Sequence, residues 1–427
     1  MKAMEKKKFR GYIIAVALFV FIFVNMGGVG CLSVFMPSII AETGYSTPQI
    51  SLMFTFAGAA SALCGLFITP TALKKLGPKK CMLVATICTV VSLFGYGRTS
   101  SLTVLYIAAA VGGFGIGIGF FAACGSMIGN WFFDKRLSII GAISAASGLG
   151  GTVFKSLSGY AITALGYRTA YTVISLVALV VGIIVQLIVR DHPSELGQTA
   201  LGAEHMDTQA AGDAGTGVEL PGLTFKEALK TPSFYLVFFG GALGIIAYMG
   251  MSMYMVTLLA TNYGMALTSA ANYNALFQFA VMVAVFFSGR IAEKIGIRGY
   301  ILYVGIAMSA GLLLIVLFGA SIIGVPIVLG IAAILVGVGG SHQSSDSSIL
   351  AQSCFGAKNF ATIQAYLIGG VNAGSALTAI VATPFIGADG SMLPCFRVFF
   401  VLSVLWMVMV LAGSILAPYK NGKSAAK

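Results

Sequence analysis

The sequence predicts an all-α polytopic membrane protein with twelve transmembrane helices, arranged as two pseudo-symmetric six-helix bundles. The chain has 427 residues, of which 58% are hydrophobic and only 9% are charged, whereas an ordinary soluble domain is about 25% charged. Apolar runs of about 20 residues recur along its whole length, and each is long enough to cross a bilayer as a helix. One long polar stretch divides these runs into two sets of six.

The transmembrane elements follow from these runs in chain order. The first bundle, residues 1–190, is expected to hold helices at 12–36, 50–71, 81–97, 102–128, 138–162 and 170–190. The second bundle, residues 232–427, is expected to hold helices at 233–260, 270–288, 300–319, 323–349, 360–382 and 396–417. The first run is too long for a signal-peptide core and lacks a clear cleavage site, so it is expected to remain as the first helix.

Residues 191–231 form the polar stretch between the two bundles. This stretch is rich in Gly, Ala, Thr and Pro and holds seven of the thirteen acidic residues. Its composition is typical of a flexible connector, and residues 225–228 predict a short surface helix at its end. It contains no catalytic pattern, so it is interpreted as a cytoplasmic linker.

The distribution of basic residues predicts that both termini lie in the cytoplasm. All but four of the 25 Lys and Arg residues fall in segments that this topology places inside. The exceptions are Arg98, Arg168 and Arg397 in outer loops, and Lys155 inside an apolar run. This bias follows the positive-inside rule. The net charge of +12 is therefore attributed to topology and not to nucleic-acid binding, and the expected location is a bacterial inner or plasma membrane.

The two sets of helices carry matching features that indicate an internal duplication. Residues 73–79, after the second helix, match residues 292–298, after the eighth, at an offset of 219. Gly115 and Gly117 match Gly337 and Gly339 at an offset of 222. Consistent offsets support two homologous halves, and parallel six-helix halves with a midplane site between them are a transporter architecture.

The loop from Gly289 to Arg298 reads G-R-I-A-E-K-I-G-I-R and is similar to the G-R-x-x-D-K-x-G-R-R signature of the major facilitator superfamily. The chain resembles this superfamily over nearly its full length. The first-half copy of the signature departs from the pattern, with Lys74 at the acidic position and Pro70 at the leading glycine. The resemblance implies secondary transport by rocking of the two halves.

Two further motifs resemble one branch of that superfamily, the oxalate/formate antiporters and monocarboxylate porters. These motifs are N-W-F-x-D-K-R-x4-G, beginning at residue 130, and T-P-S-F, beginning at residue 231. The resemblance implies that loop charges form a cytoplasmic gate, and the residues expected in this gate are Asp134, Arg136, Arg290 and Glu293. The alternative is that basic residues in these loops only set the topology.

Lys155 lies well inside the fifth apolar run. A lysine at membrane depth costs about 3 kcal/mol on insertion scales, and such residues usually face the bundle interior. There its ammonium could bind a substrate carboxylate, although its long stem could instead extend toward the outer interface. The resemblance places the fifth helix against the eighth, where Tyr273, Asn274 and Gln278 would lie at a similar depth.

Asn25, Tyr248 and Asn372 lie near the middle of helices that line the cavity in this superfamily. They are further candidates for substrate binding, beside the alternative that a neighbouring helix satisfies each polar group.

The most polar intramembrane patch is at 341–348, in the tenth helix. His342 and Asp346 are four residues apart and would share one helix face. Because histidine can gain and lose a proton near neutral pH, this pair is the candidate for proton coupling. The alternative is that a polar patch is ordinary near the cytoplasmic end of a helix.

Glycines in the fourth helix predict close helix packing and not a phosphate-binding loop. No strand precedes them, and their four-residue spacing lets helices approach closely. The residues are Gly112, Gly113, Gly115, Gly117 and Gly119. A Walker-like stretch ending at Lys155 lacks the glycine before the lysine and is rejected.

The function predicted from these features is secondary active transport of a small or medium organic monocarboxylate, with proton symport or anion exchange. The runs 270–288 and 360–382 contain no charged residue, so the cation pair that some relatives use for a dianion such as oxalate is missing. The alternative function is efflux of amphipathic compounds. No metal-ligand cluster or nucleophile–base pair occurs, so neither an enzyme nor a cofactor is expected. The expected partners are the small anion, a proton and the lipid bilayer, with the protein as a monomer.

Overall fold

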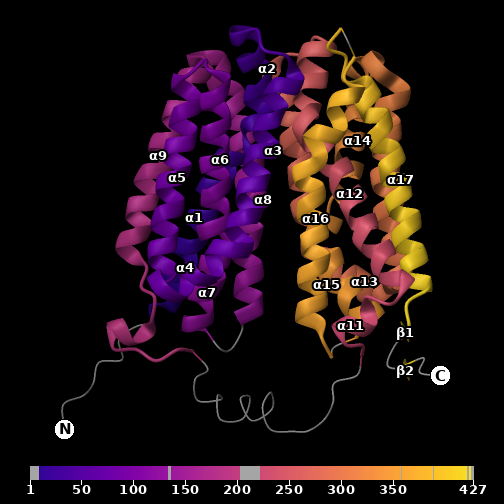
Figure 1. Cartoon of the computed structure of the whole chain (residues 1–427). Helices are drawn as coiled ribbons and strands as arrows, with labels where there is room; N and C mark the ends of the chain where they lie inside the picture. The colour runs from indigo at the N-terminus through magenta and orange to yellow at the C-terminus, as the bar shows by residue number, and fades with distance from the viewer. Residues whose placement is uncertain are drawn as a thin grey trace.

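The computed structural model describes residues 9–132, 136–201, 222–356, 358–387, 389–420 and 423–424. Figure 1 shows two groups of helices side by side, one indigo to magenta and the other orange to yellow. The start of α1 and the end of α17 lie on the same side of the molecule, which agrees with the predicted topology (Figure 1).

Six membrane-spanning units form the first half. Three of these units consist of two or three shorter helical elements, because the regular α-helix is interrupted within the span. In chain order the elements are α1 Gly11–Gly30, α2 Leu32–Thr43, α3 Thr47–Leu63, the π-helical turn η1 Cys64–Ile68, α4 Thr69–Leu76, α5 Pro78–Arg98, α6 Leu102–Gly119, α7 Phe121–Trp131, α8 Arg136–Leu165 and α9 Tyr167–Ile188.

The second half follows a short 3-10 helix and a one-turn surface helix in the linker. Its elements, with those of the linker, are η2 Pro193–Leu196, α11 Phe225–Ala228, α12 Pro232–Thr257, η4 Leu258–Asn262, α13 Leu267–Phe318, η5 Gly319–Gly324, α14 Pro326–Gly339, α15 His342–Phe355, α16 Phe360–Ala382, η6 Thr383–Phe385 and α17 Leu393–Ile415. Two short antiparallel strands, β1 Tyr419–Lys420 and β2 Lys423–Ser424, depart from an all-helical chain.

The predicted twelve-helix organisation is confirmed. Within the described residues, eight helical stretches are long and apolar enough to cross a membrane. One of these, Leu267–Gly324, contains two spans, because Gly296 is non-helical and divides α13. The other three spans are 47–76, 136–165 and 326–355. The span 326–355 is divided by a break, and its apolar part, α14, has only 14 residues. The other two spans carry more polar and small residues.

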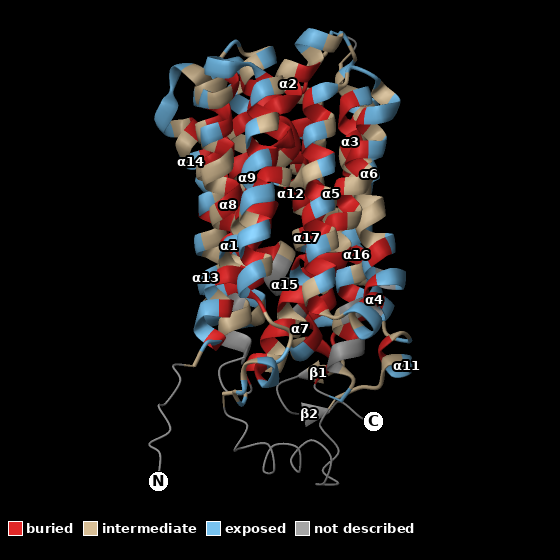
Figure 2. Cartoon of the chain, turned by 90° about the vertical axis from the view of Figure 1, so that its left-hand side faces the viewer, coloured by how far each residue is buried: buried red, intermediate tan, exposed pale blue. Residues whose placement is uncertain are grey.

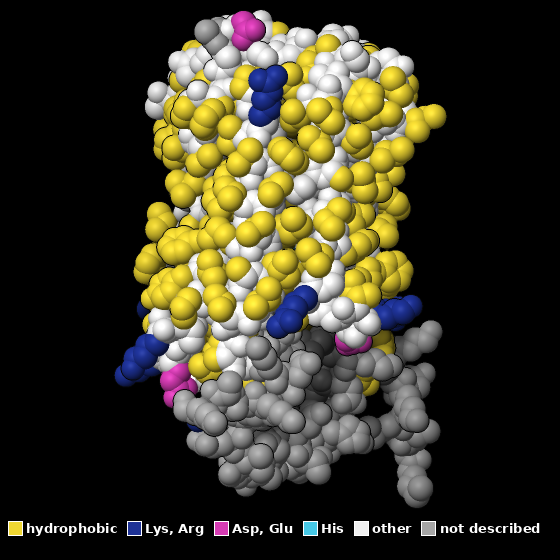
Figure 3. Space-filling view, turned by 90° about the vertical axis from the view of Figure 1, so that its right-hand side faces the viewer, with side chains coloured by type: hydrophobic (Ala, Val, Ile, Leu, Met, Phe, Trp, Pro, Cys, Tyr) yellow, Lys and Arg dark blue, Asp and Glu magenta, His cyan; other side chains and the backbone are white. Residues whose placement is uncertain are grey.

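Apolar side chains cover the outer surface of the bundle. Figure 2 shows buried residues in the interior and exposed residues on the outer faces of the helices. On the face shown in Figure 3, hydrophobic side chains are spread over the middle of the molecule, and charged side chains lie toward its two ends. Large apolar residues such as Phe286, Leu187 and Ile327 are about 70% exposed or more. This surface is suited to hydrocarbon and not to water, and the protein is a multi-pass membrane protein.

Helices four and ten break within two residues of corresponding positions. Helix four is interrupted at Phe120, between α6 and α7. Helix ten is interrupted at Gly340 and Ser341, between α14 and α15. The repeat offset of 222, taken from the glycine pairs, aligns Phe120 with His342. The duplication expected from the sequence is therefore visible in the backbone.

The glycines of helix four pack against two neighbouring helices, as predicted. A Cβ atom at Gly113 would lie 2.0 Å from the Ala57 carbonyl oxygen of α3. On another face, a Cβ at Gly119 would lie 2.3 Å from the Cβ of Ala85 in α5. Only glycine allows such close approach of helix backbones in a membrane bundle.

Small residues also allow close packing between the two halves, along α8 and α13. Cβ atoms at Gly148, Gly151 and Gly159 would lie 2.9, 3.1 and 2.8 Å from the nearest side-chain atoms of α13. A second contact joins α3 to α16, where Gly58 faces Ala376. The α8–α13 contact, here called the α8–α13 interface, positions the candidate site.

Both described ends of the linker pair with the ends of transmembrane helices. The Leu201 amide donates to the Trp131 carbonyl at the end of helix four, and the Leu223 amide donates to the Phe355 carbonyl at the end of helix ten. The predicted surface helix at 225–228 is confirmed as α11, whose Phe225 ring stacks on Tyr366 of α16.

Candidate functional site

Lys155 lies in the α8–α13 interface and does not extend to the outer surface. Its side chain is only 2% exposed. Its Nζ donates a hydrogen bond to the Ser252 Oγ of α12 at 3.3 Å. Because α8 belongs to the first half and α12 to the second, this bond joins the two halves. The alternative in which the lysine reaches the membrane interface is therefore not what the structure shows.

No carboxylate among the described residues pairs with Lys155. The single ion pair in the described ranges joins Arg168 to Glu42 at the outer end of the first half. The Cys31 thiol of the α1–α2 junction lies near the ammonium, but it donates to the Gly27 carbonyl at 3.0 Å. A buried cation without a counter-ion is costly, so this environment favours an anionic ligand.

Asn274 lies beside the same serine, as the sequence predicted for its depth. Its side chain is fully buried, and its Nδ2 donates to the Ser252 carbonyl oxygen at 3.2 Å. Its Oδ1 has no hydrogen-bond partner among the described residues. Ser252 thus connects α8, α12 and α13 at one point. Tyr273 was expected at this depth too, but its hydroxyl donates outward, to the Pro326 carbonyl at 3.4 Å.

A second polar group lies one helical turn away, along α8 and α12. Gln278 packs against Gly151, which is four residues before Lys155. Tyr248 is four residues before Ser252, and its hydroxyl accepts a hydrogen bond from the Gln343 Nε2 at 3.1 Å. Gln278 also lies within hydrogen-bonding reach of this hydroxyl. The structure therefore brings Tyr248, Gln278 and Gln343 together next to the Lys155 group.

Asn25 and Asn372 lie outside these two groups. Asn25 is fully buried, its Nδ2 donates to the Phe21 carbonyl within α1, and its Oδ1 is without a partner among the described residues. Asn372 is exposed on α16, one turn from Ala376, which contacts Gly58 of α3. Residues four apart share a helix face, so Asn372 lies on the face of α16 that is directed toward the first half.

His342 lies inside the second half and not between the halves. It is 1% exposed, and its ring lies 4.4 Å from the Trp406 ring and 6.2 Å from the Tyr248 ring. Its Nδ1 lies 2.9 Å from the Gly339 carbonyl. Because a carbonyl only accepts, Nδ1 carries the hydrogen and Nε2 is left as the acceptor. Nε2 lies against Gly244 and has no hydrogen-bond partner among the described residues.

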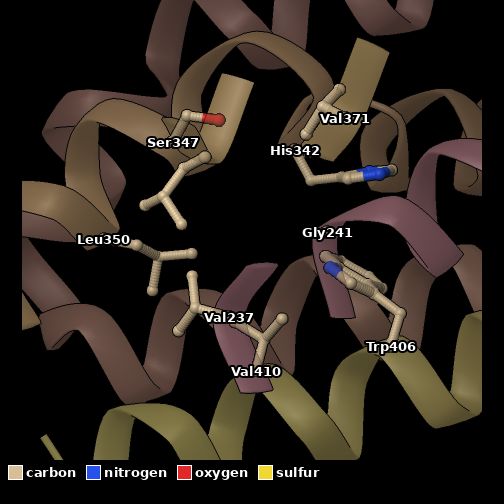
Figure 4. A pocket seen from close by; sticks show the side chains of 9 residues that line it. Val237, Gly241, His342, Ser347, Leu350, Val371, Trp406 and Val410 are labelled. Carbon is tan, nitrogen blue, oxygen red and sulfur yellow. The ribbon is translucent and has the colours of Figure 1, made fainter. Parts of the chain in front are cut away.

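The cavity next to His342 is too small for an organic substrate. Its volume is about 10 Å³. Figure 4 shows His342, Trp406 and Ser347 around it together with apolar side chains of α12, α15, α16 and α17. His342 and Asp346 both belong to α15 and are four residues apart. The Asp346 side chain lies outside the described residues.

The expected gate residues are only partly visible. Asp134 lies outside the described residues, and Arg136 begins α8 with a side chain that is also outside them. Arg290 and Glu293 are exposed on α13, and the described residues give no ion pair between them. The gate remains a prediction.

The N-W motif beside the predicted gate has a clear structural role. The Asn130 Nδ2 donates to the Asp191 carbonyl at 3.0 Å, and the Trp131 Nε1 donates to the Arg190 carbonyl at 2.8 Å. The Asp191 Oδ1 in turn accepts from the Lys79 amide at the start of α5, at 2.7 Å. A carboxylate at a helix N-terminus is stabilising. The motif thus ties the end of helix four to the end of helix six and the start of helix three.

A groove of about 510 Å³ runs along the lipid-facing side of the α8–α13 interface. Its rims include Leu157 and Phe279, which are 58% and 44% exposed. Its polar residues are linked, since the Ser156 Oγ donates to the Asn272 Oδ1 at 2.5 Å and the Asn272 Nδ2 donates to the Tyr160 hydroxyl at 3.2 Å.

Ser252 and Gln343 were not predicted as site residues. A lone serine between methionines gives no signal of its own, because serine is common at packed membrane helices. The helical spacing could have identified it, since Ser252 is one turn from Tyr248. Gln343 was part of the polar patch in helix ten, but attention there went to the ionisable residues.

Comparison with known proteins agrees with this architecture. The sequence model of the Major Facilitator Superfamily matches residues 18–341, more than half of the chain. Probable hexose phosphate transport proteins of Chlamydia trachomatis and Chlamydia muridarum are each 22% identical over 167 residues, which are 39% of this chain and 36% of each relative. The chain thus matches little more than a third of the length of these relatives.

Several solved transporter structures share the fold. A bacterial homologue of the human lysosomal transporter Spinster, in an inward-facing and occupied conformation, is 16% identical with a TM-score of 0.69, covering 97% of both chains. A peptide transporter, POT, in complex with sulfate is 13% identical with a TM-score of 0.70, covering 95% of both. The nucleoside transporter NupG is 13% identical with a TM-score of 0.68, covering 95% of this chain and 100% of that one.

Proposed function

Because the chain belongs to the Major Facilitator Superfamily, and is thus a secondary transporter and not an enzyme, we propose that it carries a small or medium organic monocarboxylate across the membrane. The two halves would rock about a site at the α8–α13 interface. Lys155 would bind the carboxylate, with Asn274 and the group around Tyr248 and Gln278 supplying hydrogen bonds to the rest of the substrate.

The observation that carries this proposal is the isolated charge of Lys155. Lys155 is 2% exposed, and its ammonium makes a hydrogen bond across the halves to a neutral hydroxyl, without a carboxylate partner among the described residues. Charge-assisted bonds to a carboxylate are about twice as strong as neutral ones. A substrate carboxylate would therefore supply the counter-ion that the described part of the protein does not.

The charge balance favours a monoanion over a dianion. The span 270–288, which packs against α8, and the span 360–382 contribute no second deep cation, since both are uncharged. A sugar phosphate is the main competing anion, because the relatives from Chlamydia are named as probable hexose phosphate transporters. The similarity to these relatives supports an anionic substrate. The presence of a single deep lysine supports a substrate with one negative charge.

Proton coupling through His342 and Asp346 is part of the proposal. The available Nε2 of His342 supports a role in accepting a proton, and Tyr248 connects its surroundings to Gln278 and the substrate group. Exchange against a second anion is the alternative mode.

We also propose that Asn25 and Asn372 contact substrate at other points of the cycle. Asp134, Arg136, Arg290 and Glu293 would form the cytoplasmic gate, and the protein would act as a monomer in a bacterial inner or plasma membrane.

The lateral groove favours a second candidate function, the efflux of amphipathic compounds. Its apolar rims and its linked polar residues, Ser156 and Asn272, suit a molecule with both hydrocarbon and hydrogen-bonding parts. Such a molecule could enter from the bilayer. In that case Lys155 would have a structural role only.

Uptake into proteoliposomes tests these alternatives. The panel contains labelled acetate, butyrate, octanoate, oxalate, glucose 6-phosphate and a cationic dye, each with and without a pH gradient. The expected result is saturable uptake of one or more monocarboxylates. Oxalate and glucose 6-phosphate should not be taken up. Transport of the dye without any carboxylate would refute the proposal in favour of efflux. Transport of glucose 6-phosphate alone would show that the substrate is a sugar phosphate and not a monocarboxylate, while the proposal of an anion site would stand.

A further inference from the structure

Ser252 offers an unused hydrogen-bond donor at the point where the two halves meet. Its Oγ accepts from the Lys155 Nζ at 3.3 Å, so the hydroxyl hydrogen is free to point elsewhere. Within the described ranges no acceptor takes this hydrogen. The residue is partly exposed, whereas Lys155 and Asn274 are buried. Ser252 is thus the most exposed of these three residues.

The position of Ser252 is held by its backbone. Its carbonyl oxygen accepts from the Asn274 Nδ2 at 3.2 Å, and Asn274 is fully buried on α13. The serine lies inside α12, whose neighbouring residues Met251 and Met253 are buried. A hydroxyl on such a supported backbone is preorganised, which reduces the entropy lost when a ligand binds.

From this geometry we infer that Ser252 is a second anion-binding residue, which donates to the same carboxylate as Lys155 from the opposite half. A carboxylate has two oxygens and about four acceptor positions, so it can accept from both donors together. One oxygen would take an ammonium N–H of Lys155 and the other the Ser252 O–H. The inference rests on the proposed function and adds to it the link between substrate binding and contact of the halves.

Binding of the anion would replace the direct hydrogen bond between Lys155 and Ser252 with two stronger hydrogen bonds, one from each residue to the anion. In the structure the halves are joined here by a hydrogen bond to a neutral acceptor. With the anion bound, both donors would make charge-assisted bonds to one group. The contact between the two halves at this point would therefore be weak without the anion and strong with the anion bound.

Anion binding to the purified full-length protein tests the inference. The probe is butyrate or octanoate, whichever the transport panel favours, and the readout is the anion-dependent rise in melting temperature. Loss of a hydrogen bond to a charged group weakens binding roughly tenfold or more. We expect this loss for Ser252→Ala, and affinity within about threefold of wild type for Ser252→Thr, which keeps the hydroxyl. Ser233→Ala is the matched control, since Ser233 lies on the same helix but bonds to Gly413 within the second half.

A distance measurement separates ligand binding from a purely structural effect. Spin labels at Lys75→Cys and Lys294→Cys, exposed positions in the two matching loops, report the distance between the halves. We expect the anion to shift this distance in wild type and in Ser252→Thr, but not in Ser252→Ala at saturating anion.

Two outcomes would overturn the inference while leaving the proposed function intact. Unchanged affinity in Ser252→Ala would show that the hydroxyl is not a ligand, and increased affinity would show that it competes with the anion for Lys155. If instead Lys155→Gln binds the anion as wild type does, or no monocarboxylate binds at all, the proposed function itself fails and the inference with it.

Discussion

Gly77 and Gly296 adopt almost the same backbone conformation at equivalent points of the two halves. Their φ and ψ values are 81° and 162° for Gly77, and 75° and 163° for Gly296. Gly77 separates α4 from α5, and Gly296 separates the two spans within α13. This region of φ and ψ is essentially restricted to glycine, so the duplicated loop depends on a glycine in both copies.

The first prediction concerns these two glycines. Alanine at either position would be strained, at a cost of roughly 1–3 kcal/mol. Gly77→Ala should be worse, because its new Cβ would lie 2.7 Å from the Asp191 Oδ2, while a Cβ at Gly296 would meet nothing within 4 Å. Melting temperatures of the two variants in detergent would check the order. A less stable Gly296→Ala would show that strain at Gly77 is relieved by movement of Asp191.

The second prediction concerns the close packing of helices two and four. Gly113→Ala should strongly destabilise the first half, because its Cβ would lie 2.0 Å from the Ala57 carbonyl oxygen, a backbone atom. Overpacking of this kind costs about 1–3 kcal/mol or more. Gly125→Ala is the control in the same transmembrane unit, since nothing lies within 4 Å of its Cβ position. The yield of monodisperse protein and its melting temperature are the measurements, and equal values for both variants would contradict the packing role.

Much of this fold was predictable from the sequence, because each half repeats simple physical signals. Apolar runs located every span, and small residues at four-residue spacing located the contacts around Gly113. The helix ends were less predictable. The structure extends the second helix to Leu76 and the tenth to Phe355, since polar residues at the membrane surface continue a helix without continuing an apolar run.

The site was predictable only in part, because side-chain direction depends on helix rotation and on breaks. Asn274 was expected beside Lys155 and reaches the same serine, while its neighbour Tyr273 points elsewhere, since adjacent residues differ by about 100° around a helix. His342 was expected to carry a proton, but the sequence did not show which helices would surround it. It lies inside the second half, on α15 directly after the break at Gly340 and Ser341, and no sequence pattern shows such a break.

The third prediction concerns the two tryptophans. Both are fully buried, but the Trp131 Nε1 donates to the Arg190 carbonyl, whereas the Trp406 Nε1 has no hydrogen-bond partner among the described residues. Replacement by phenylalanine removes a similar volume at each site, but only at Trp131 does it also remove a hydrogen bond. Trp131→Phe should therefore lower the free energy of unfolding by about 1 kcal/mol more than Trp406→Phe does. Chemical unfolding in detergent would measure the difference. Equal losses would mean that the hydrogen bond to Arg190 adds no net stability.

The fourth prediction concerns proton coupling. His342→Gln keeps a polar side chain but cannot take up a proton near neutral pH, so a pH gradient should no longer drive accumulation of substrate. Exchange of labelled for unlabelled substrate should continue, since that mode needs no net proton movement. His192→Gln is the control, because His192 lies outside the spans, next to η2. Accumulation by His342→Gln at the wild-type level would remove this histidine from the coupling step.

The last prediction concerns the charge of Lys155. Lys155→Gln should weaken binding of the transported carboxylate by a factor of about 10 to 100, the loss expected for a hydrogen bond between charged groups. Lys155→Arg keeps the charge in a larger side chain, so it should retain more of the affinity than Lys155→Gln. The removal of an unpaired buried charge also predicts a second effect, since such a charge destabilises the empty protein. Without anion, Lys155→Gln should therefore melt at a temperature equal to or above that of wild type, and only with anion should wild type become the more stable protein. A variant that lost stability in both conditions would show that Lys155 is bound to a counter-ion of the protein itself, and the case for an anionic substrate would then have to be made without it.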